Sequence, residues 1–388
     1  MRDFVGEQNT SQGMINKTLC AEHIQFHIHL HLGILSKLRF NFIFSIRFGE
    51  MKRADIRIDM QQTYVYMETT KVESDFMYDD YFLFSTSSFL AVYSKIHKTI
   101  YRIAGSKVHG FKDGEKNESK FNGITDFIQT CSDILVADMH NHCIRISSRY
   151  NLHEAETLMF AGLCETPGST DGDIMSARFI QPRALALYES TLYVADATGL
   201  RKIHDSETVT TVVDDGVTRH GLQLHPIPVY VYFTANTYVG RINLNNSYTE
   251  IVSGSKNETG FTDGSLLDAR FSSCHGFQFL NQHVILLSDR GRDTLRVIDF
   301  SEQKTSTICV HRQQNESQQV LSNTNGDINN CELVQPRSLD IKVKSGVSEL
   351  YKIADTKAIV QQAYSEVIIS TALGIMSLQL FKGKKAVK

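Results

Sequence analysis

The sequence has no excess of positive charge, and this absence bears on its partners. Its 388 residues include 40 Lys and Arg against 43 Asp and Glu, which gives a formal net charge of −3. Proteins that bind nucleic acid need a cationic face to neutralise phosphates. The only basic run here is KGKK at residues 382–385. Nucleic acid is therefore not expected as a partner.

Paired cysteines are also missing. None of the seven cysteines forms a Cys-x-x-Cys pair, which excludes zinc ribbons and related zinc sites. Their odd number argues against a complete disulfide framework. We expect buried free thiols. The alternative is a bridge between Cys309 and Cys331 if the protein is secreted.

The chain contains none of the short catalytic motifs and no clear membrane span. G-x-S-x-G, G-x-G-x-x-G, the P-loop and H-E-x-x-H are all absent, so we predict no cofactor and no metal. Residues 32–48 are apolar but are interrupted by Lys37, Arg39 and Arg47. The apolar run 366–381 is shorter than the roughly 20 residues that a spanning helix needs.

These observations predict three regions. Residues 1–55 are interpreted as a leader, disordered or translated from non-coding sequence, and residues 56–381 as the folded domain. Residues 382–388 form a basic tail. The run 366–381 reads as a strand, a turn and a strand. We expect this hairpin to pair with an N-terminal strand around residues 61–67, which would remove an exposed sheet edge.

What the sequence does contain is a repeated pair of motifs. The first is a strand, an acidic turn and a second strand, as in ILVADMHNHCIRI at 134–146, LYVADATGLRKI at 192–203, ILLSDRGRDTLRVI at 285–298 and, more loosely, LYKIADTKAIV at 350–360. The second precedes it, as in FKDG, STDGDIMSARFIQP, FTDGSLLDARF and NTNGDINNCELVQP. The two motifs are 25 or 26 residues apart in three copies and 30 in the fourth.

Two weaker copies complete the series, at residues 89–105 and 229–242. Six units of roughly 40 to 65 residues, each with several short strands, are typical of a β-propeller. The pattern of a Gly, then DG, A-R-F, P, LYVAD, N-H and I-R resembles the NHL repeat, and MHNHCIRI is its closest match. The resemblance implies an all-β, six-bladed propeller with four antiparallel strands per blade, here without a RING or B-box portion. It does not imply an activity.

Acidic residues recur in the turns of these repeats. A carboxylate at such a turn accepts hydrogen bonds from backbone N–H groups two or three residues on. Because a catalytic residue would break the repeat, we interpret the recurring acids as structural, with Arg178 and Arg270 as possible partners. The acids are Asp113, Asp138, Asp171, Asp196, Asp263, Asp289 and Asp355.

Candidate binding residues open the apolar runs expected to line the axis. Arg183, His275 and Arg337 occupy matching positions in three repeats. Two guanidinium groups would repel a cation but suit a carboxylate or phosphate. The hypothesis is that one mouth of the channel captures an anionic group of a partner. The alternative is that each arginine pairs with an acid of its own blade.

The compartment is indicated by glycosylation sequons. Asn117, Asn257 and Asn315 lie in N-x-S/T sequences within loops predicted to join blades, where an acceptor must be exposed. The sequons favour an extracellular or lumenal protein, although no clean signal peptide precedes the repeats.

The favoured function is a non-catalytic binding platform for protein or peptide partners. The second candidate is a metal-dependent hydrolase or lyase with an axial site near His275, because propeller enzymes resembling this fold place metal ligands near such positions. It lacks the several His, Asp, Asn or Glu side chains such a site needs. RNA binding is the third candidate, and the charge balance disfavours it.

Overall fold

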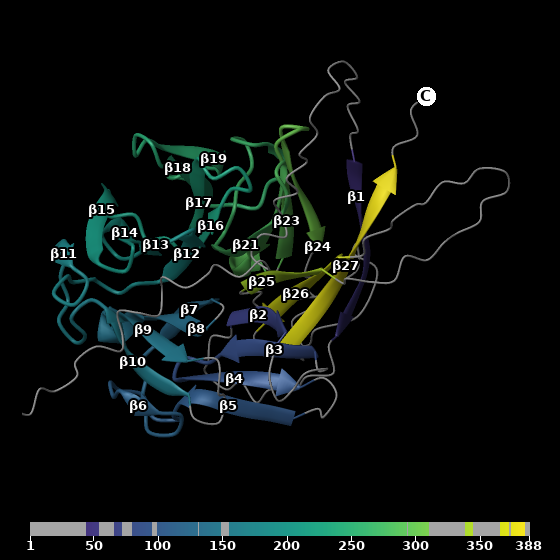
Figure 1. Cartoon of the computed structure of the whole chain (residues 1–388). Coiled ribbons are helices and arrows are strands. Elements are labelled where there is room, and N and C mark those ends of the chain that lie inside the picture. The colour runs from purple at the N-terminus through teal and green to yellow at the C-terminus, as the bar shows by residue number, and fades with distance from the viewer. Residues whose placement is uncertain are drawn as a thin grey trace, which may run out of the picture.

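The structure is a computed structural model that describes residues 44–53, 66–71, 80–94, 99–130, 132–148, 155–292, 294–309, 338–343, 365–371 and 374–384. These residues form antiparallel sheets arranged around a common centre (Figure 1). Helix in this part of the chain is confined to two short 3₁₀ turns, η1 (Met139–Asn141) and η2 (Arg290–Arg292). The predicted all-β propeller is confirmed.

Five blades are each built from one continuous stretch of chain. The first contains β2 (Tyr66–Lys71), β3 (Asp80–Ser85), β4 (Phe89–Ser94) and β5 (Thr99–Gly105). The second contains β7 (Ile124–Gln129), β8 (Asp133–Asp138), β9 (Cys143–Ser148) and β10 (Glu156–Ala161), with β6 (Gly114–Glu115) outside β10. The third contains β12 (Ala184–Tyr188), β13 (Thr191–Ala195), β14 (Gly199–His204) and β15 (Thr208–Asp214), with β11 (Gly172–Asp173) outside β15.

The fourth and fifth blades continue the pattern. The fourth contains β16 (Gly221–Leu224), β17 (Tyr230–Ala235), β18 (Tyr238–Asn243) and β19 (Thr249–Gly254). The fifth contains β21 (Cys274–Asn281), β22 (Val284–Asp289), β23 (Thr294–Asp299) and β24 (Lys304–Cys309), with β20 (Gly264–Ser265) outside β24. The predicted four strands per blade therefore become five wherever the DG motif adds a two-residue strand to the outer edge.

A further sheet combines both ends of the chain. It orders β1 (Phe44–Arg53), β27 (Gly374–Lys384), β26 (Ser365–Thr371) and β25 (Ser338–Val343), and Figure 1 shows the purple β1 beside the yellow β27. The prediction of six blades is therefore wrong. The structure has five blades, each built from one continuous stretch of chain, and this composite sheet in addition. The motifs expected to form a sixth repeat, at 323–336 and 350–360, lie outside the described residues.

The predicted C-terminal hairpin is present, but its partner differs from the prediction. β26 pairs with β27, and β27 pairs with β1 instead of a strand at 61–67. Tyr66 and Met67 belong to β2, which pairs with β3. The strand β1 therefore falls inside the range interpreted as a leader. Arg47, one of the charges that interrupt the apolar run 32–48, lies within β1. A strand accommodates such a charge because alternate residues of a strand face opposite sides.

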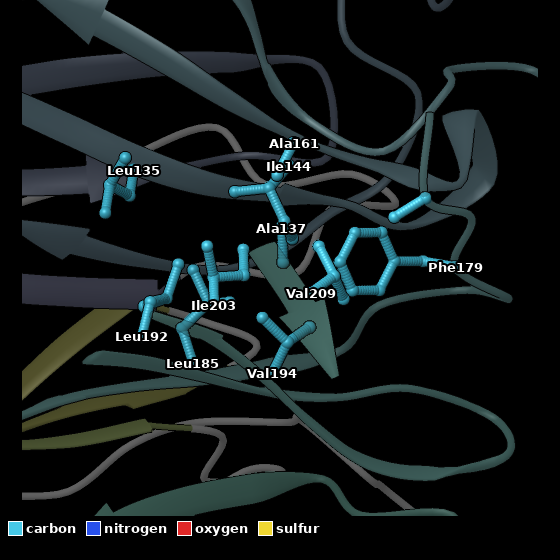
Figure 2. Close-up of a cluster of buried hydrophobic side chains, with 11 residues drawn as sticks. Leu135, Ala137, Ile144, Ala161, Phe179, Leu185, Leu192, Val194, Ile203 and Val209 are labelled. Carbon is cyan, nitrogen blue, oxygen red and sulfur yellow. The ribbon is translucent and has the colours of Figure 1, made fainter. Parts of the chain in front are cut away.

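The hydrophobic core lies between neighbouring blades. Leu135 and Ala137 of β8 form one cluster with Leu185 of β12 and Val194 of β13, and Phe179 lies at one end of it (Figure 2). Each blade strand therefore needs apolar side chains toward its neighbour, which is why ILVA and LYVA recur. Truncating a fully buried phenylalanine such as Phe179 typically costs about 3–5 kcal/mol.

One glycine in each strong repeat is required by this packing. Gly162 has φ +83°, and a Cβ added there would lie 2.5 Å from a ring carbon of Phe179. Gly105 and Gly254 contact Phe121 and Phe271 in the same way, with positive φ values of 87° and 93°. The repeat therefore needs glycine at this position, because any side chain there would clash with the phenylalanine of the same repeat.

Candidate functional site

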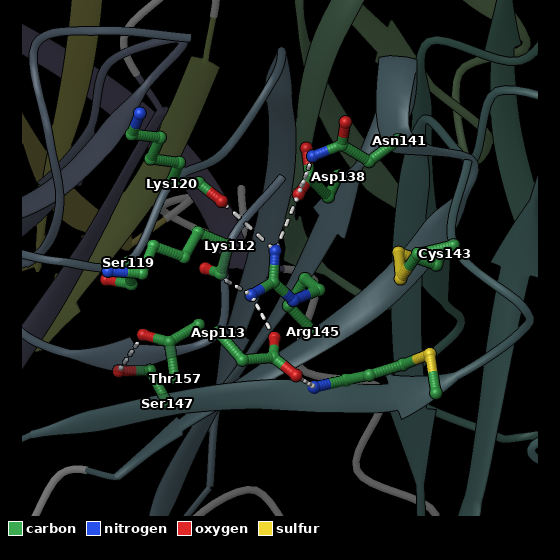
Figure 3. A network of polar contacts seen from close by, with 12 residues as sticks. Lys112, Asp113, Ser119, Lys120, Asp138, Asn141, Cys143, Arg145, Ser147 and Thr157 are labelled. Carbon is green, nitrogen blue, oxygen red and sulfur yellow. Dashed lines mark hydrogen bonds and ion pairs between the residues drawn. A yellow bond between two sulfur atoms is a disulfide. The ribbon is translucent and has the colours of Figure 1, made fainter. Parts of the chain in front are cut away.

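The turn acids of the second blade surround a buried arginine. Arg145 has a fully buried side chain, and its Nη1 lies 3.2 Å from Oδ2 of Asp138 while its Nη2 lies 2.5 Å from Oδ1 of Asp113 (Figure 3). The guanidinium also packs over the rings of Phe111 and Phe121, at 4.8 and 5.3 Å from their centroids. Asp113 and Asp138, which were expected to bind backbone N–H groups in turns, therefore form ion pairs with an arginine of β9.

The same arrangement recurs in the third and fifth blades. Arg201 contacts Asp171 and Asp196, with shortest N–O distances of 2.5 and 3.7 Å. Arg296 contacts Asp263 and Asp289 at 2.9 and 3.6 Å. Three buried arginines thus each lie between two acids of their own blade: Arg145, Arg201 and Arg296. Asp355 lies outside the described residues.

The arginines named from the sequence as partners of these acids are not the ones that bind them. Arg270 pairs with Glu258, and the side chain of Arg178 lies against Gly168. The partners come instead from the second strand of each hairpin, in the segments I-R-I, L-R-K and L-R-V. The reason is geometric, because the second strand of each hairpin returns its arginine to the turn at which the acid sits.

Two of the hairpin acids, Asp138 and Asp289, have pKa values raised by burial. Burial raises the pKa of Asp138 to about 6, although hydrogen bonds from the Asn122 backbone and the Asn141 side chain, and the charge of Arg145, oppose the shift. Burial likewise raises the pKa of Asp289, against hydrogen bonds from the backbone of Ser273 and Ser272. A carboxylate enclosed in this way has no contact with a ligand, which agrees with a structural role.

A second polar group lies at the N-terminal ends of the inner strands. We call it the axial mouth and define it by His140, Arg183, His220, His275 and Arg290. Inner strands of successive blades contact one another, β7 with β12, β12 with β16, and β16 with β21. The backbone N–H groups of His140 and Arg290 donate to Asn122 and Ser273, which precede β7 and β21, and so the two 3₁₀ turns join this end of the axis.

The two histidines from adjacent blades stack at this mouth. The rings of His220 and His275 have centroids 4.6 Å apart and planes 28° apart. Nε2 of His220 lies 2.7 Å from Oδ1 of Asn236. His275, named from the sequence, is therefore part of an imidazole pair whose other member was not named.

Arg183, also named from the sequence, is held by amide groups. Its Nη2 donates to Oε1 of Gln181 at 2.8 Å, and the Gln181 backbone N–H donates to Nδ1 of His142 at 3.1 Å. Among the residues whose side chains are described, no carboxylate lies within ion-pair distance of Arg183. Arg337 lies outside the described residues.

The positive charges of the mouth act on its imidazoles. Burial lowers the pKa of His220, and the charges of Arg183 and Arg290 lower it further, against a hydrogen bond with Asn236. Burial also lowers the pKa of His140, together with the charges of Arg183, His142 and His109. No acid contributes to either shift. The charge of Arg183 therefore acts on imidazoles from two different blades.

Below the mouth, polar side chains connect the inner strands. Asp126 of β7 accepts hydrogen bonds from the backbone N–H of Leu185 at 2.8 Å and of Phe127 at 2.9 Å. Burial raises its pKa to about 7, against these two hydrogen bonds. Gln223 of β16 donates to Oε1 of Gln278 on β21 at 2.7 Å. These contacts join neighbouring blades where no ladder of backbone hydrogen bonds does so.

The cysteines differ from the expectation of free thiols. Cys143 and Cys164 form a disulfide with a Cα–Cα distance of 5.0 Å, because the turn after β8 meets the loop that follows β10. Cys274 is free and buried. The alternative bridge between Cys309 and Cys331 involves a residue outside the described part of the chain.

The remaining sequence-based sites can be placed in part. Asn117 and Asn257 are both exposed, and Arg102 donates to Oδ1 of Asn117 at 2.8 Å, while Asn315 lies outside the described residues. Glycosylation stays a prediction. Within the described residues, no three His, Cys, Asp or Glu side chains are grouped as metal ligands. Nor does this part of the chain contain a helix of the length and apolar character that spans a bilayer.

Comparison with known proteins supports the fold and nothing finer. No protein-family profile matches the sequence, and no curated protein is similar to it at a significant level. An auxiliary nutrient binding protein from Bacteroides thetaiotaomicron VPI-5482 superposes with a TM-score of 0.56 at 10% identity, over 89% of this chain and 79% of its own. A putative phosphatase from the same organism gives 0.54 at 10% identity, over 88% and 80%. The expected NHL membership is therefore not established.

Proposed function

We propose that this propeller is a binding platform for protein or peptide partners, and that its axial mouth holds a carboxylate of the partner. The observation that carries the proposal is Arg183, a guanidinium at the mouth with an amide neighbour and no described acid within reach. Arg290 adds a second guanidinium to the same electrostatic environment. A carboxylate completes a charge-assisted hydrogen bond with such a donor.

Two features of the scaffold support this role. The three buried arginines are each neutralised by two acids of their own blade, so their charge is satisfied inside the structure. Arg183 differs from them in lacking such acids among the described residues. We also propose that the composite sheet completes the ring between the fifth blade and the first, because β25 contacts both β21 and β2. A closed ring holds the mouth residues of different blades at constant separation.

The experiment is a binding titration of the full chain with a hexa-aspartate peptide, using a hexa-asparagine peptide as the uncharged control. Arg183→Ala should weaken binding of the acidic peptide about tenfold or more, because a hydrogen bond to a charged group contributes about 1.5–3 kcal/mol. The matched control is Arg178→Ala, which removes the same charge from a side chain lying against Gly168. Equal effects of the two substitutions, or no binding at all, would refute the proposal.

A further inference from the structure

Gln181, the hydrogen-bond partner of Arg183, has a backbone conformation that favours glycine. It is the second residue after the repeat phenylalanine Phe179, and the equivalent residue in the second repeat is Gly123, two residues after Phe121. Both positions are left-handed, with φ +88° at Gly123 and +52° at Gln181. Glycine adopts this conformation without steric cost, whereas the Cβ of any other residue opposes it. The third repeat therefore keeps a side chain where a glycine would satisfy the backbone.

This glutamine accompanies the arginine along the sequence. Oε1 of Gln181 accepts a hydrogen bond from Nη2 of Arg183 at 2.8 Å. The triplet Gln-Pro-Arg occurs at the same place in two repeats, at 181–183 and 335–337, and the second copy lies outside the described residues. Repeats without the arginine also lack the glutamine, with Gly-Ile-Thr at 123–125 and Ser-Cys-His at 273–275. The strained side chain is therefore retained where there is a guanidinium for it to hold.

We propose that Gln181 determines the specificity of the carboxylate site, because its amide orients Arg183 without neutralising the guanidinium. This inference rests on the proposed function. The buried arginines Arg145, Arg201 and Arg296 are held by carboxylates, which cancel their charge. An amide oxygen accepts the same hydrogen bond but carries no negative charge. The guanidinium is thus held in one orientation and keeps its charge for an acid of the partner.

His142 anchors Gln181 from the neighbouring blade. Its Nδ1 accepts the backbone N–H of Gln181 at 3.1 Å, and burial lowers the pKa of His142, which favours the neutral ring that accepts this bond. The backbone of His142 is itself left-handed, with φ +60°. The next residue, Cys143, forms the disulfide with Cys164. His142 is therefore a positioning residue that acts on the guanidinium through Gln181.

Replacing Gln181 by glutamate tests whether the neutral amide matters. The test is calorimetric titration of the full chain with the hexa-aspartate peptide at constant ionic strength. Gln181→Glu offers Arg183 an internal carboxylate, so it should weaken binding about tenfold or more, as Arg183→Ala does. Gln303→Glu is the matched control, because Gln303 also has φ +52° and lies at the opposite end of β23 from η2. It adds the same charge and should change the Kd much less.

Replacing Gln181 by glycine tests whether the orientation matters. Gln181→Gly keeps the backbone N–H and suits the left-handed backbone, so only the acceptor for Arg183 is lost. Binding should weaken about two- to tenfold, because the partner then has to immobilise a free arginine side chain, while the Tm stays the same or rises. Gln303→Gly is again the control. His142→Ala should also weaken binding, and His142→Asn, which supplies an acceptor and tolerates the left-handed conformation, should restore part of it.

The outcomes separate the two proposals. Absence of binding by the unsubstituted chain refutes the carboxylate site itself. Weaker binding in Arg183→Ala with normal binding in both Gln181→Glu and Gln181→Gly refutes the inference and leaves the site intact. Equal losses in Gln181→Glu and Gln303→Glu also refute it, because net charge then accounts for the effect. Circular dichroism melts establish that each variant is folded.

Discussion

Replacing Arg145 by methionine tests the account of the buried arginines most directly. The guanidinium donates to the backbone carbonyls of Lys112 and Lys120, both at 3.1 Å, as well as to Asp113 and Asp138. Methionine retains the packing against the phenylalanine rings but supplies no donor. The substitution therefore leaves Asp138 fully buried without a cation.

The expected cost is large because an uncompensated charge remains. Removing one partner of a buried ion pair costs about 3–5 kcal/mol. Asp138 keeps hydrogen bonds from the Asn122 backbone and from the Asn141 side chain, at 2.8 and 2.7 Å, and these prevent a still larger loss. Adding Asp138→Asn to Arg145→Met should restore part of the stability, because it removes the charge that had lost its partner.

Urea denaturation followed by circular dichroism measures this effect, since the chain has no tryptophan. Lys112→Met is the control. It removes an ion pair with Glu118 whose side chains are 51% and 66% exposed, and such solvent-screened pairs contribute little to stability. If Arg145→Met destabilises no more than Lys112→Met, or if Asp138→Asn gives no recovery, the buried arginines are not what stabilises the hairpin turns.

Three further predictions concern stability. Reducing the disulfide between Cys143 and Cys164, which are 21 residues apart, should lower the free energy of unfolding by about 3 kcal/mol; an unchanged Tm with reductant would contradict this. The native pKa of Asp126, about 7, lies above its usual 3.8, so stability should fall as pH rises from about 4 to about 7, and Asp126→Asn should flatten that dependence in urea titrations. Deleting residues 1–53 should cause aggregation in light scattering because β27 loses β1, whereas a chain lacking only 1–43 should stay monodisperse.

The repeat was predictable because its signals are local. Alternating apolar residues and a turn acid lie within a few residues of one another, and a DG dipeptide recurs 25 or 26 residues ahead of the acid in three copies. The composite sheet was not predictable in the same way. Its strand β1 pairs with β27 across almost the whole chain, and a short alternating segment does not specify a partner at that distance.

The three buried arginines occupy equivalent positions in the strand register although their spacing in the sequence differs. The buried arginine follows the hairpin acid by seven residues in two blades and by five in the third, so spacing alone does not align Arg201 with the others. In the structure, Arg145 pairs with Val136, Arg201 with Val194 and Arg296 with Leu287. Each partner lies two residues before the acid, because a shorter turn in the third blade keeps the same register.

The sequence by itself determined the propeller class and the positions of most hairpins, because these depend on local patterns. Only the tertiary structure decided which groups meet. His140, Arg183, His220 and Arg290 are separated by tens of residues, and each precedes or follows a different strand. They form one mouth because the inner strands of successive blades contact one another and begin at the same end of the axis. The disulfide between Cys143 and Cys164 likewise depends on strand pairing, since Cys143 begins β9 and Cys164 follows β10, and these two strands pair within the second blade.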